Sequence, residues 1–324
     1  MTTVDRAAAR DTLTYRQVRP DELASCVGVW RLSINDYIVP LNQPEIPDET
    51  GPLLRLYRHL LSTDPERFVV AVRPDPDAPD GERVVGFAAA VQRERLWFLS
   101  MCFILPEAQG RGVGRELVAR IAPSTRDDGE LVRATATDTA QPISNALYAS
   151  LGIVPRVPLL NLIGTPRRAE AFGALPSGIT PVPFDVLARQ DHDGLATIVD
   201  GLDRELLGVA HPIDHAYIRE EGRRGWLYHG PDGAPIGYGY ATEAGRVGPI
   251  ATRDPALMTP ILGHLMTEVI PRGAFAIWMP GTAGESVTAA LRAGFRLEPF
   301  PLLLCWDRPF VDLTRYLPIS PGLL

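Results

Sequence analysis

The sequence contains no lysine, and all 32 of its basic residues are arginines. A nucleotide-binding P-loop requires the motif Gly-Lys-Ser/Thr, so this class of phosphate site is excluded. Cysteine is also scarce: Cys26, Cys102 and Cys305 are odd in number, far apart and surrounded by apolar residues. This usage predicts buried free thiols in a reducing compartment rather than a disulfide framework.

Long apolar runs are lacking as well. The sequence has no stretch of 18 apolar residues, which argues against a transmembrane helix. Residues 1–11 are polar and charged, without the apolar centre of a secretory signal peptide. We therefore expect a cytoplasmic protein that does not contact membranes.

The composition is that of an ordinary folded protein, with 45% apolar and 22% charged residues. The net charge of −7 offers no basic face for a nucleic acid, so a nucleic-acid partner is not expected. A length of 324 residues is comfortable for two domains.

One glycine-rich stretch organises the rest of the chain. Residues 109–114 read Gln-Gly-Arg-Gly-Val-Gly, after an apolar strand pattern at 95–105 and before a helical pattern at 115–121. Such a turn places backbone N–H groups at the positive end of a helix dipole, which suits a phosphate group. Gly112 and Gly114 lack the Cβ atoms that would hold a phosphate at a distance.

Three phosphate-binding motifs compete for this stretch. A Rossmann fingerprint needs a third glycine where Arg115 stands, and a P-loop needs the missing lysine. The third pattern, Q-x-x-G-x-G at the head of a helix, is matched in full by Gln109, Gly112 and Gly114. On these residues the stretch resembles the acyl-CoA pyrophosphate loop of the GCN5-related N-acetyltransferases (GNAT). An ordinary glycine turn between a strand and a helix is the competing interpretation.

A second motif follows one strand later. Residues 145–153 read Asn-Ala-Leu-Tyr-Ala-Ser-Leu-Gly-Ile, a short helix that we expect to be capped near Ser144 and to end at its glycine. It resembles the second cofactor motif of the family, N-x-x-L/A-Y-x-x-x-G-F, with Ile153 in place of Phe. Asn145 and Tyr148 share one helix face, which in the family looks at the pantetheine arm and the thioester. Alternatively, they are an N-terminal cap and a packing aromatic.

The predicted elements repeat along the chain. The first part is predicted to contain a strand, two helices, three strands, the glycine loop with its helix, a strand, the short helix and a strand at 156–163 that would complete the sheet. A linker follows, and the same order of elements then begins again. Similar short residue patterns recur at 146–160 and 290–303, which indicates an internal repeat. We predict an α/β protein of two tandem GNAT-like domains, each a mostly antiparallel twisted sheet flanked by helices. The predicted divisions are residues 1–168, a linker at 169–178, and residues 179–324.

The two copies differ in their chemistry. Where the first copy has its glycine loop, residues 253–258 of the second read Arg-Asp-Pro-Ala-Leu-Met. Pro255 has no N–H to offer, and Asp254 would repel a pyrophosphate. Val287 and Ala290 stand near the positions of the asparagine and tyrosine of the second motif. The cofactor is therefore expected in the first half only, and the second half is predicted to be a degenerate copy.

The resemblance implies an N-acetyltransferase. Such an enzyme moves an acetyl group from acetyl-CoA to a primary amine of a small-molecule or peptide acceptor, by direct transfer in a ternary complex. No Cys-His or Ser-His pattern argues for an acyl-enzyme, and no metal is expected. By analogy with the family, the acetyl-CoA site would comprise Phe103, Ile104, Leu105, Gln109, Gly110, Arg111, Gly112, Val113, Gly114, Arg115, Asn145 and Tyr148.

Three residues are candidates for catalysis by the same analogy. The backbone N–H of Phe103 would polarise the thioester carbonyl, and Tyr148 would be the general acid toward the leaving thiolate. A phenol pKa of about 10 is a reasonable match for a thiol pKa of about 8.5. Glu94, at the start of the central strand, is the candidate general base, with an exposed surface charge as the competing interpretation. Deprotonation through water or binding of a neutral amine are further alternatives.

In the family, acceptor specificity lies in the first two helices and their loop, here residues 29–61. The residues that would line a cationic amine pocket there, or would equally be core and surface, are Trp30, Asp36, Tyr37, Glu45 and Tyr57. The alternative function is a non-catalytic acyl-CoA binding or sensing protein, in which the loop binds but no base exists.

Two further features do not by themselves indicate a catalytic role. His211 and His215 are four positions apart, but Pro212 and the lack of a clear third ligand argue against a metal site. The apolar tail at 311–324 is expected to dock on the body of the protein or on a second subunit of a homodimer.

Overall fold

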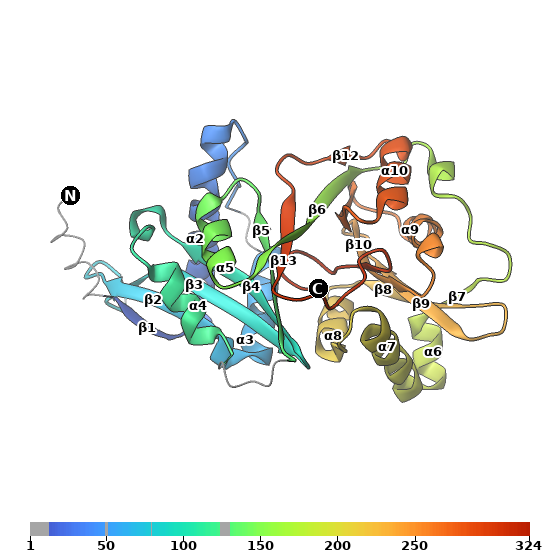
Figure 1. Cartoon of the computed structure of the whole chain (residues 1–324), viewed down its shortest axis with the longest axis horizontal. Helices are drawn as coiled ribbons and strands as arrows, with labels where there is room; N and C mark the ends of the chain where they lie inside the picture. Colours follow the sequence, from blue (N-terminus) through green and yellow to red (C-terminus); the bar gives the residue numbers. More distant parts are fainter. Residues whose placement is uncertain (1–12, 49–50, 79, 124–129) are drawn as a thin grey trace. The chain divides into compact units, whose positions relative to one another are not determined.

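The computed structural model describes residues 13–48, 51–78, 80–123 and 130–324 (Figure 1). Residues 1–11, for which we predicted no signal peptide, lie outside these ranges. The chain divides into two compact units. The first is Met1–Gln92, Trp97–Ala134 and Ala140–Gly152, and the second is Arg93–Leu96, Thr135–Thr139 and Ile153–Leu324. None of the described helices has the length and apolar character needed to span a bilayer.

The first half of the chain forms strands in the order β1-β2-β3-β4-β5. These strands are β1 (Thr14–Gln17), β2 (Phe68–Pro74), β3 (Glu82–Arg93), β4 (Leu96–Ile104) and β5 (Val132–Asp138). The helices are α2 (Leu23–Ile38), α3 (Gly51–Thr63), α4 (Val113–Ile121) and α5 (Pro142–Ser150), with short 3-10 turns η1 (Pro20–Glu22), η2 (Val39–Leu41), η3 (Pro65–Arg67) and η4 (Pro106–Ala108). The predicted order of elements is confirmed for this half.

The aromatic core of the first unit lies between α3 and the sheet. Tyr57 packs edge-on against Phe68 and Phe87, with ring centroids 5.8 and 5.3 Å apart. The β2 strand is buried over its first five residues, on both of its faces, because α4 packs on it as well. This explains its nearly continuous apolar sequence.

The second unit has strands in the order β13-β6-β11-β10-β9-β8-β7, with β12 beside β6 and β14 beside β10. The strands are β6 (Val154–Gly164), β7 (Thr180–Pro183), β8 (Arg224–His229), β9 (Pro235–Ala241), β10 (Arg246–Thr252), β11 (Phe275–Pro280), β12 (Arg296–Leu297), β13 (Leu302–Trp306) and β14 (Tyr316–Leu317). The helices are α6 (Phe184–Gln190), α7 (His192–Leu206), α8 (Pro212–Glu220), α9 (Met258–Thr267) and α10 (Gly284–Ala293), with turns η5 (Ala169–Phe172) and η6 (Pro255–Leu257).

One strand has a different partner from the one we expected. The strand at 156–163 was predicted to complete the first sheet, but β6 pairs antiparallel with β11 and with β13. Leu159, for example, lies opposite both Pro280 and Leu302. The alternation of a strand tells which residues share a face, and it does not tell which sheet edge the strand joins. The division into domains at residue 168 stays a prediction.

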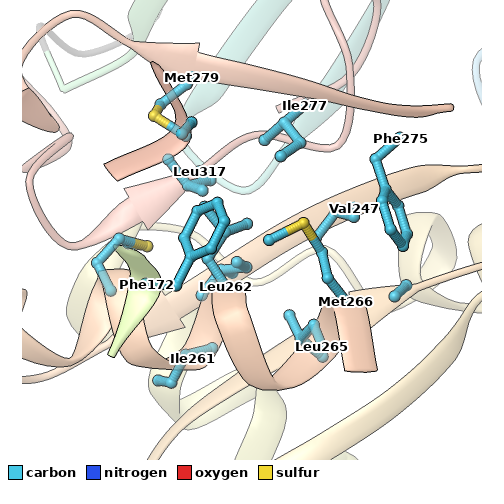
Figure 2. Packing of buried hydrophobic residues seen from close by; sticks show 14 of the residues in the cluster. Phe172, Val247, Ile261, Leu262, Leu265, Met266, Phe275, Ile277, Met279 and Leu317 are labelled. Atoms are coloured by element: carbon cyan, nitrogen blue, oxygen red, sulfur yellow. The ribbon is translucent and has the colours of Figure 1, made fainter. Parts of the chain in front are cut away.

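The apolar core of the second unit lies between α9 and the strands β10 and β11 (Figure 2). Phe172 of η5 packs into this core with 2% of its surface exposed. This turn lies within residues 169–178, which were predicted as a linker, and its aromatic side chain belongs to the core. Burying one such side chain contributes about 1.5–3 kcal/mol.

The C-terminal tail docks on the body of its own chain. In β14, Leu317 and Tyr316 pair antiparallel with Ile250 and Ala251 of β10. Leu317 is part of the core shown in Figure 2, and Leu323 at the end of the tail is also buried. Of the two expected docking places, the structure shows the body of the protein.

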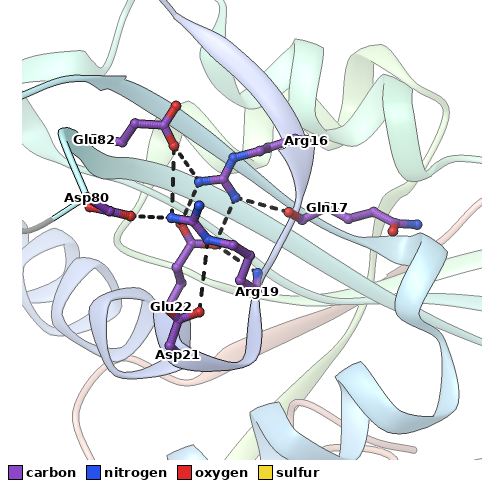
Figure 3. A network of polar contacts seen from close by, with 7 residues as sticks. All are labelled: Arg16, Gln17, Arg19, Asp21, Glu22, Asp80 and Glu82. Atoms are coloured by element: carbon purple, nitrogen blue, oxygen red, sulfur yellow. Dashed lines mark hydrogen bonds and ion pairs between the residues drawn. The ribbon is translucent and has the colours of Figure 1, made fainter.

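A network of charged residues fastens the N-terminal strand of the first unit (Figure 3). Arg16 donates to both carboxylate oxygens of Glu22, at 2.8 and 2.7 Å, and to Glu82 at 2.7 Å. The Arg19 backbone N–H also donates to Glu22, and its guanidinium pairs with Asp80. Burial raises the pKa of Glu22, but the hydrogen bonds from Arg16 and Arg19 outweigh it, so the pKa is lowered.

We predict that Glu22→Gln lowers the free energy of unfolding by about 1–3 kcal/mol at pH 7, since a charged hydrogen-bond acceptor is lost. Because the folded-state pKa of Glu22 lies below its ordinary 4.5, this stabilisation is complete above that pH and is lost as the pH falls through the folded value. Urea unfolding of both proteins between pH 3 and 7 tests this. The difference should shrink in acid.

Asp21→Asn is the matched control. Its side chain is 80% exposed and lies 3.9 Å from Arg19, so its replacement should change stability by less than about 0.5 kcal/mol. Equal stability of the wild type and Glu22→Gln at pH 7 would contradict the role of the network.

Candidate functional site

The glycine loop follows the strand β4, whose burial changes along its length. Its first five residues are buried and its last four, 101–104, are only half-buried. Side chains of both strand faces are therefore partly exposed where the strand reaches the loop. This end of β4 is the part of the strand that a ligand can approach.

The loop itself has the backbone conformation that the glycines predict. Gly110 and Gly112 have φ angles of 70° and 83°, a left-handed conformation that other residues adopt only at a cost. Gly112 is the N-cap of α4, and no side chain of the described residues caps this helix start. The first N–H groups of α4 are thus presented without an internal side-chain acceptor, at the positive end of the helix.

The side chain of Gln109 ties the loop to the strand. Its Nε2 donates to the carbonyl oxygen of Ile104 at 2.9 Å, and the same oxygen accepts from Ser33 Oγ at 2.8 Å. Leu105 donates its N–H to Val85 and accepts from the N–H of Ala108, both at 2.8 Å. Two of the three strand residues expected to pair with pantetheine, Ile104 and Leu105, therefore have backbone groups already engaged.

Gly114 allows three elements to meet. A Cβ atom on Gly114 would lie 3.1 Å from Ile104 Cδ1, 3.5 Å from Leu147 Cδ2 and 3.9 Å from Cys102 Sγ. The start of α4, the end of β4 and the helix α5 are thus in contact around this glycine. The two sequence motifs that resemble the family's cofactor motifs are brought together by the fold.

Tyr148 of α5 is buried, and its hydroxyl makes a hydrogen bond with the thiol of Cys102. Burial raises the pKa of this thiol to about 12, and the hydrogen bond from Tyr148 opposes the rise only in part. Sequence reasoning treated Cys102 as one more buried thiol. The period of two along β4, which puts Cys102 on the same face as Ile104, was the signal that could have placed it beside the loop.

The neighbouring polar residues make local contacts. Asn145 Nδ2 donates to the carbonyl of Gln141 at 2.8 Å, and α5 begins at Pro142 with Gln141 as its cap, not near Ser144. Arg115 donates to Ser150 Oγ at 3.1 Å, which links α4 to α5. Proline suits the first position of a helix, which explains the earlier start.

The structure does not bring Glu94 to this site. Glu94 lies in the turn before β4 with a φ of 45°, and it is counted with the second unit. Its carboxylate accepts from Arg204 at 2.9 Å and from the Ala210 N–H at 3.2 Å. The six strand steps from Leu96 to Cys102 alone span about 20 Å at 3.3 Å per residue. We therefore leave Glu94 out of the candidate site.

The second unit closes the corresponding loop with its own side chain. Asp254 is the N-cap of η6 and accepts from the Ala256 N–H at 2.9 Å. Arg253 is held by Glu205 through contacts of 2.8–3.0 Å. An internal carboxylate thus caps the turn η6, which leads directly into α9, whereas no such carboxylate stands in the glycine loop before α4.

Two of the five residues considered for an acceptor pocket have other roles. Tyr57 is fully buried in the aromatic core, and Glu45 pairs with Arg31 and with Asn35 Nδ2, each at 3.3 Å. The remaining three occupy α2, where Trp30 and Tyr37 are half-buried and Asp36 is exposed.

Solved structures of the same fold cover nearly the whole chain. A putative acetyltransferase from Pyrococcus horikoshii aligns with a TM-score of 0.67 and 15% identity over 96% of both chains. A GCN5-related N-acetyltransferase from Sphaerobacter thermophilus aligns with 0.58 and 17% identity, over 94% of this chain and 98% of its own. A tandem GNAT protein from the clavulanic acid biosynthesis pathway gives 0.50 and 18% identity, over 92% and 99%. The chain therefore has a tandem GNAT fold.

Part of the sequence also matches a family model. Residues 30–153 match the model of the acetyltransferase (GNAT) family, a range that includes β4, the glycine loop and α5. The predicted resemblance of this part of the chain to the family is confirmed. No curated protein sequence matches the chain.

The raised pKa of Cys102 predicts slow alkylation in the folded protein. At pH 8, a thiol with a pKa of about 12 carries about a thousandfold less thiolate than one at the ordinary 9.0. Modification by iodoacetamide, followed by mass spectrometry of the Cys102 peptide, should therefore be strongly suppressed relative to the protein in urea. Equal rates in the folded and unfolded protein would show that the thiol is not desolvated.

Proposed function

We propose that the chain is an N-acetyltransferase that uses acetyl-CoA bound to its first unit and acetylates a primary amine of a small molecule or peptide. The observation that carries this proposal is the start of α4. Two glycines with positive φ lead into a helix whose first N–H groups have no side-chain cap among the described residues, while in the second unit Asp254 caps the turn η6 that leads into α9. A helix N-terminus prepared in this way suits a pyrophosphate.

The rest of the proposed cofactor site follows from this position. The N–H groups from Gly110 to Gly114 would hold the pyrophosphate, and the half-buried Arg111 lies in the same loop. The pantetheine arm would run along the half-buried end of β4 and pair with Phe103. Asn145 and Tyr148 lie on the α5 side of this strand end, where Gly114 lets the elements approach.

Acyl transfer needs stabilisation of the oxyanion and a proton for the departing thiolate. The Phe103 N–H is proposed to polarise the thioester carbonyl, a contribution of about 10²–10³ in rate for such a donor. Tyr148 is proposed to be the general acid, and its hydroxyl already donates toward a sulfur atom, that of Cys102. With Glu94 engaged by Arg204, we propose that the amine loses its proton through water or binds as the neutral form.

We predict that Gly112→Glu abolishes CoA binding, because it places a carboxylate at the helix start and forces a side chain into a φ of 83°. Isothermal titration with CoA measures this. Gly112→Ala separates the two causes, since it brings the backbone strain without the charge and should retain weaker binding.

Asp254→Ala is the control in the second unit. It should cost about 1 kcal/mol of stability by removing a cap, while the affinity for CoA stays unchanged. Wild-type affinity in Gly112→Glu would place the cofactor elsewhere and overturn the proposal.

We predict that Tyr148→Phe lowers kcat by about 10²–10⁴, with the dissociation constant for CoA nearly unchanged. The readout is CoA release with a panel of polyamines, aminoglycosides, amino acids and peptide N-termini. Tyr37→Phe, on the acceptor side, is the matched control and should change KM more than kcat. CoA binding without turnover on any amine would instead support an acyl-CoA binding or sensing protein.

A further inference from the structure

The two histidines that the sequence left without a function lie on one side of α8. Pro212 is the first residue of this helix and His211 is its N-cap, so the proline starts the helix and does not disrupt it. His211 and His215 are therefore one turn apart, with stacked rings whose centroids lie 4.4 Å from each other. Both imidazoles are 2% exposed.

A third candidate ligand, Asp203, comes from α7, the preceding helix (Figure 1). Asp203 Oδ2 lies 2.8 Å from His215 Nε2 and 3.3 Å from His211 Nε2. The three candidate donor atoms are all within 4.8 Å of one another, and Asp203 is fully buried. The fold thus supplies the third ligand whose absence from the sequence motif argued against a metal.

The atoms that point away from this convergence have partners of their own. Asp203 Oδ1 accepts a hydrogen bond from Tyr238, and His215 Nδ1 lies 2.9 Å from the Tyr240 hydroxyl. Metal-binding imidazoles typically donate their second nitrogen in this way, which fixes the ring and leaves Nε2 for the metal. The Tyr316 hydroxyl is 3.4 Å from His211 Nε2, on the inner side of the cluster.

The carboxylates on both sides of the His211 ring favour a cation beside it. Its Nε2 faces the Asp203 carboxylate at 3.3 Å, and its Nδ1 faces Asp214 Oδ2 at 3.8 Å. A neutral imidazole has one N–H, so in either tautomer one lone pair points at a carboxylate. Asp214 is already neutralised by two 2.8 Å hydrogen bonds from Arg93, which leaves Asp203 as the charge to be balanced.

We propose that Asp203, His211 and His215 bind one first-row divalent metal ion, for which zinc is the best match to a donor set of two imidazoles and one carboxylate. Zinc bonds of about 2.0–2.1 Å place tetrahedral donors about 3.3 Å apart. The pair of His211 and Asp203 already has this spacing, and the pair of His215 and Asp203, at 2.8 Å, would open by about 0.5 Å. The Tyr316 hydroxyl or a water completes the coordination. The ion joins α7, α8 and the C-terminal tail, and its role is structural because the site is closed to solvent.

Metal analysis of the whole chain, prepared without a histidine tag, tests this site. Protein treated with EDTA and then dialysed against zinc should retain about one zinc per chain, and its thermal midpoint should rise with zinc and fall with chelator. Under cobalt loading, the untouched sequence should show the visible absorption of a tetrahedral Co²⁺ site. That measurement does not depend on whether a variant folds.

His211→Gln should lose the bound zinc and the effect of chelator on the thermal midpoint. The matched control is His192→Gln, since this histidine is exposed at the start of α7 and lies outside the cluster. Less than about a tenth of an equivalent of zinc in the wild type, with a midpoint that ignores both zinc and chelator, would overturn the proposal and leave an imidazolium to balance Asp203. Equal zinc in His211→Gln and the wild type would also overturn it.

Discussion

The start of a helix leaves backbone N–H groups without partners, and the two halves of this chain differ in how they meet that need. In the first unit, Gly110 and Gly112 lead into α4 with positive φ, and no described side chain caps the helix. In the second unit, the carboxylate of Asp254 caps η6, the turn that leads into α9, by accepting from the Ala256 N–H. A carboxylate of the protein and a phosphate of a ligand satisfy the same electrostatic demand. One side chain can therefore close a site that its absence would leave ready for an anion.

Signals within a few residues of each other predicted most of the local structure. The glycine loop and the short helix α5 could be predicted from the sequence, because turns with positive φ and apolar helical periods are encoded locally. No helix was predicted at α8, and Pro212 was used only to argue against a metal site, although proline favours the first turn of a helix. The partner strands of β6 were unpredictable from its own pattern, since alternation does not choose between two sheet edges.

The loop of the candidate site could be predicted from the sequence, whereas the contacts of its side chains could not. Glu94 is held by Arg204, 110 positions later, and no local motif carries such a long-range pair. Gln109 matched the family motif, yet its side chain binds the strand carbonyl of Ile104. The contact between Tyr148 and Cys102 depends on the close approach that Gly114 allows, which is a property of the packed elements and not of either motif.

The second unit keeps the fold without the glycine loop, and its interior is not purely apolar. Its core around α9 is closed by Phe172 from one side and by Leu317 from the tail (Figure 2). Beside it two carboxylates are buried. The guanidinium of Arg93 compensates Asp214, whereas the partners of Asp203 among the described residues are imidazoles and a phenol. An uncompensated buried charge costs several kcal/mol, and apolar side chains of similar volume would avoid that cost. The zinc ion proposed at Asp203, His211 and His215 would supply this missing positive charge.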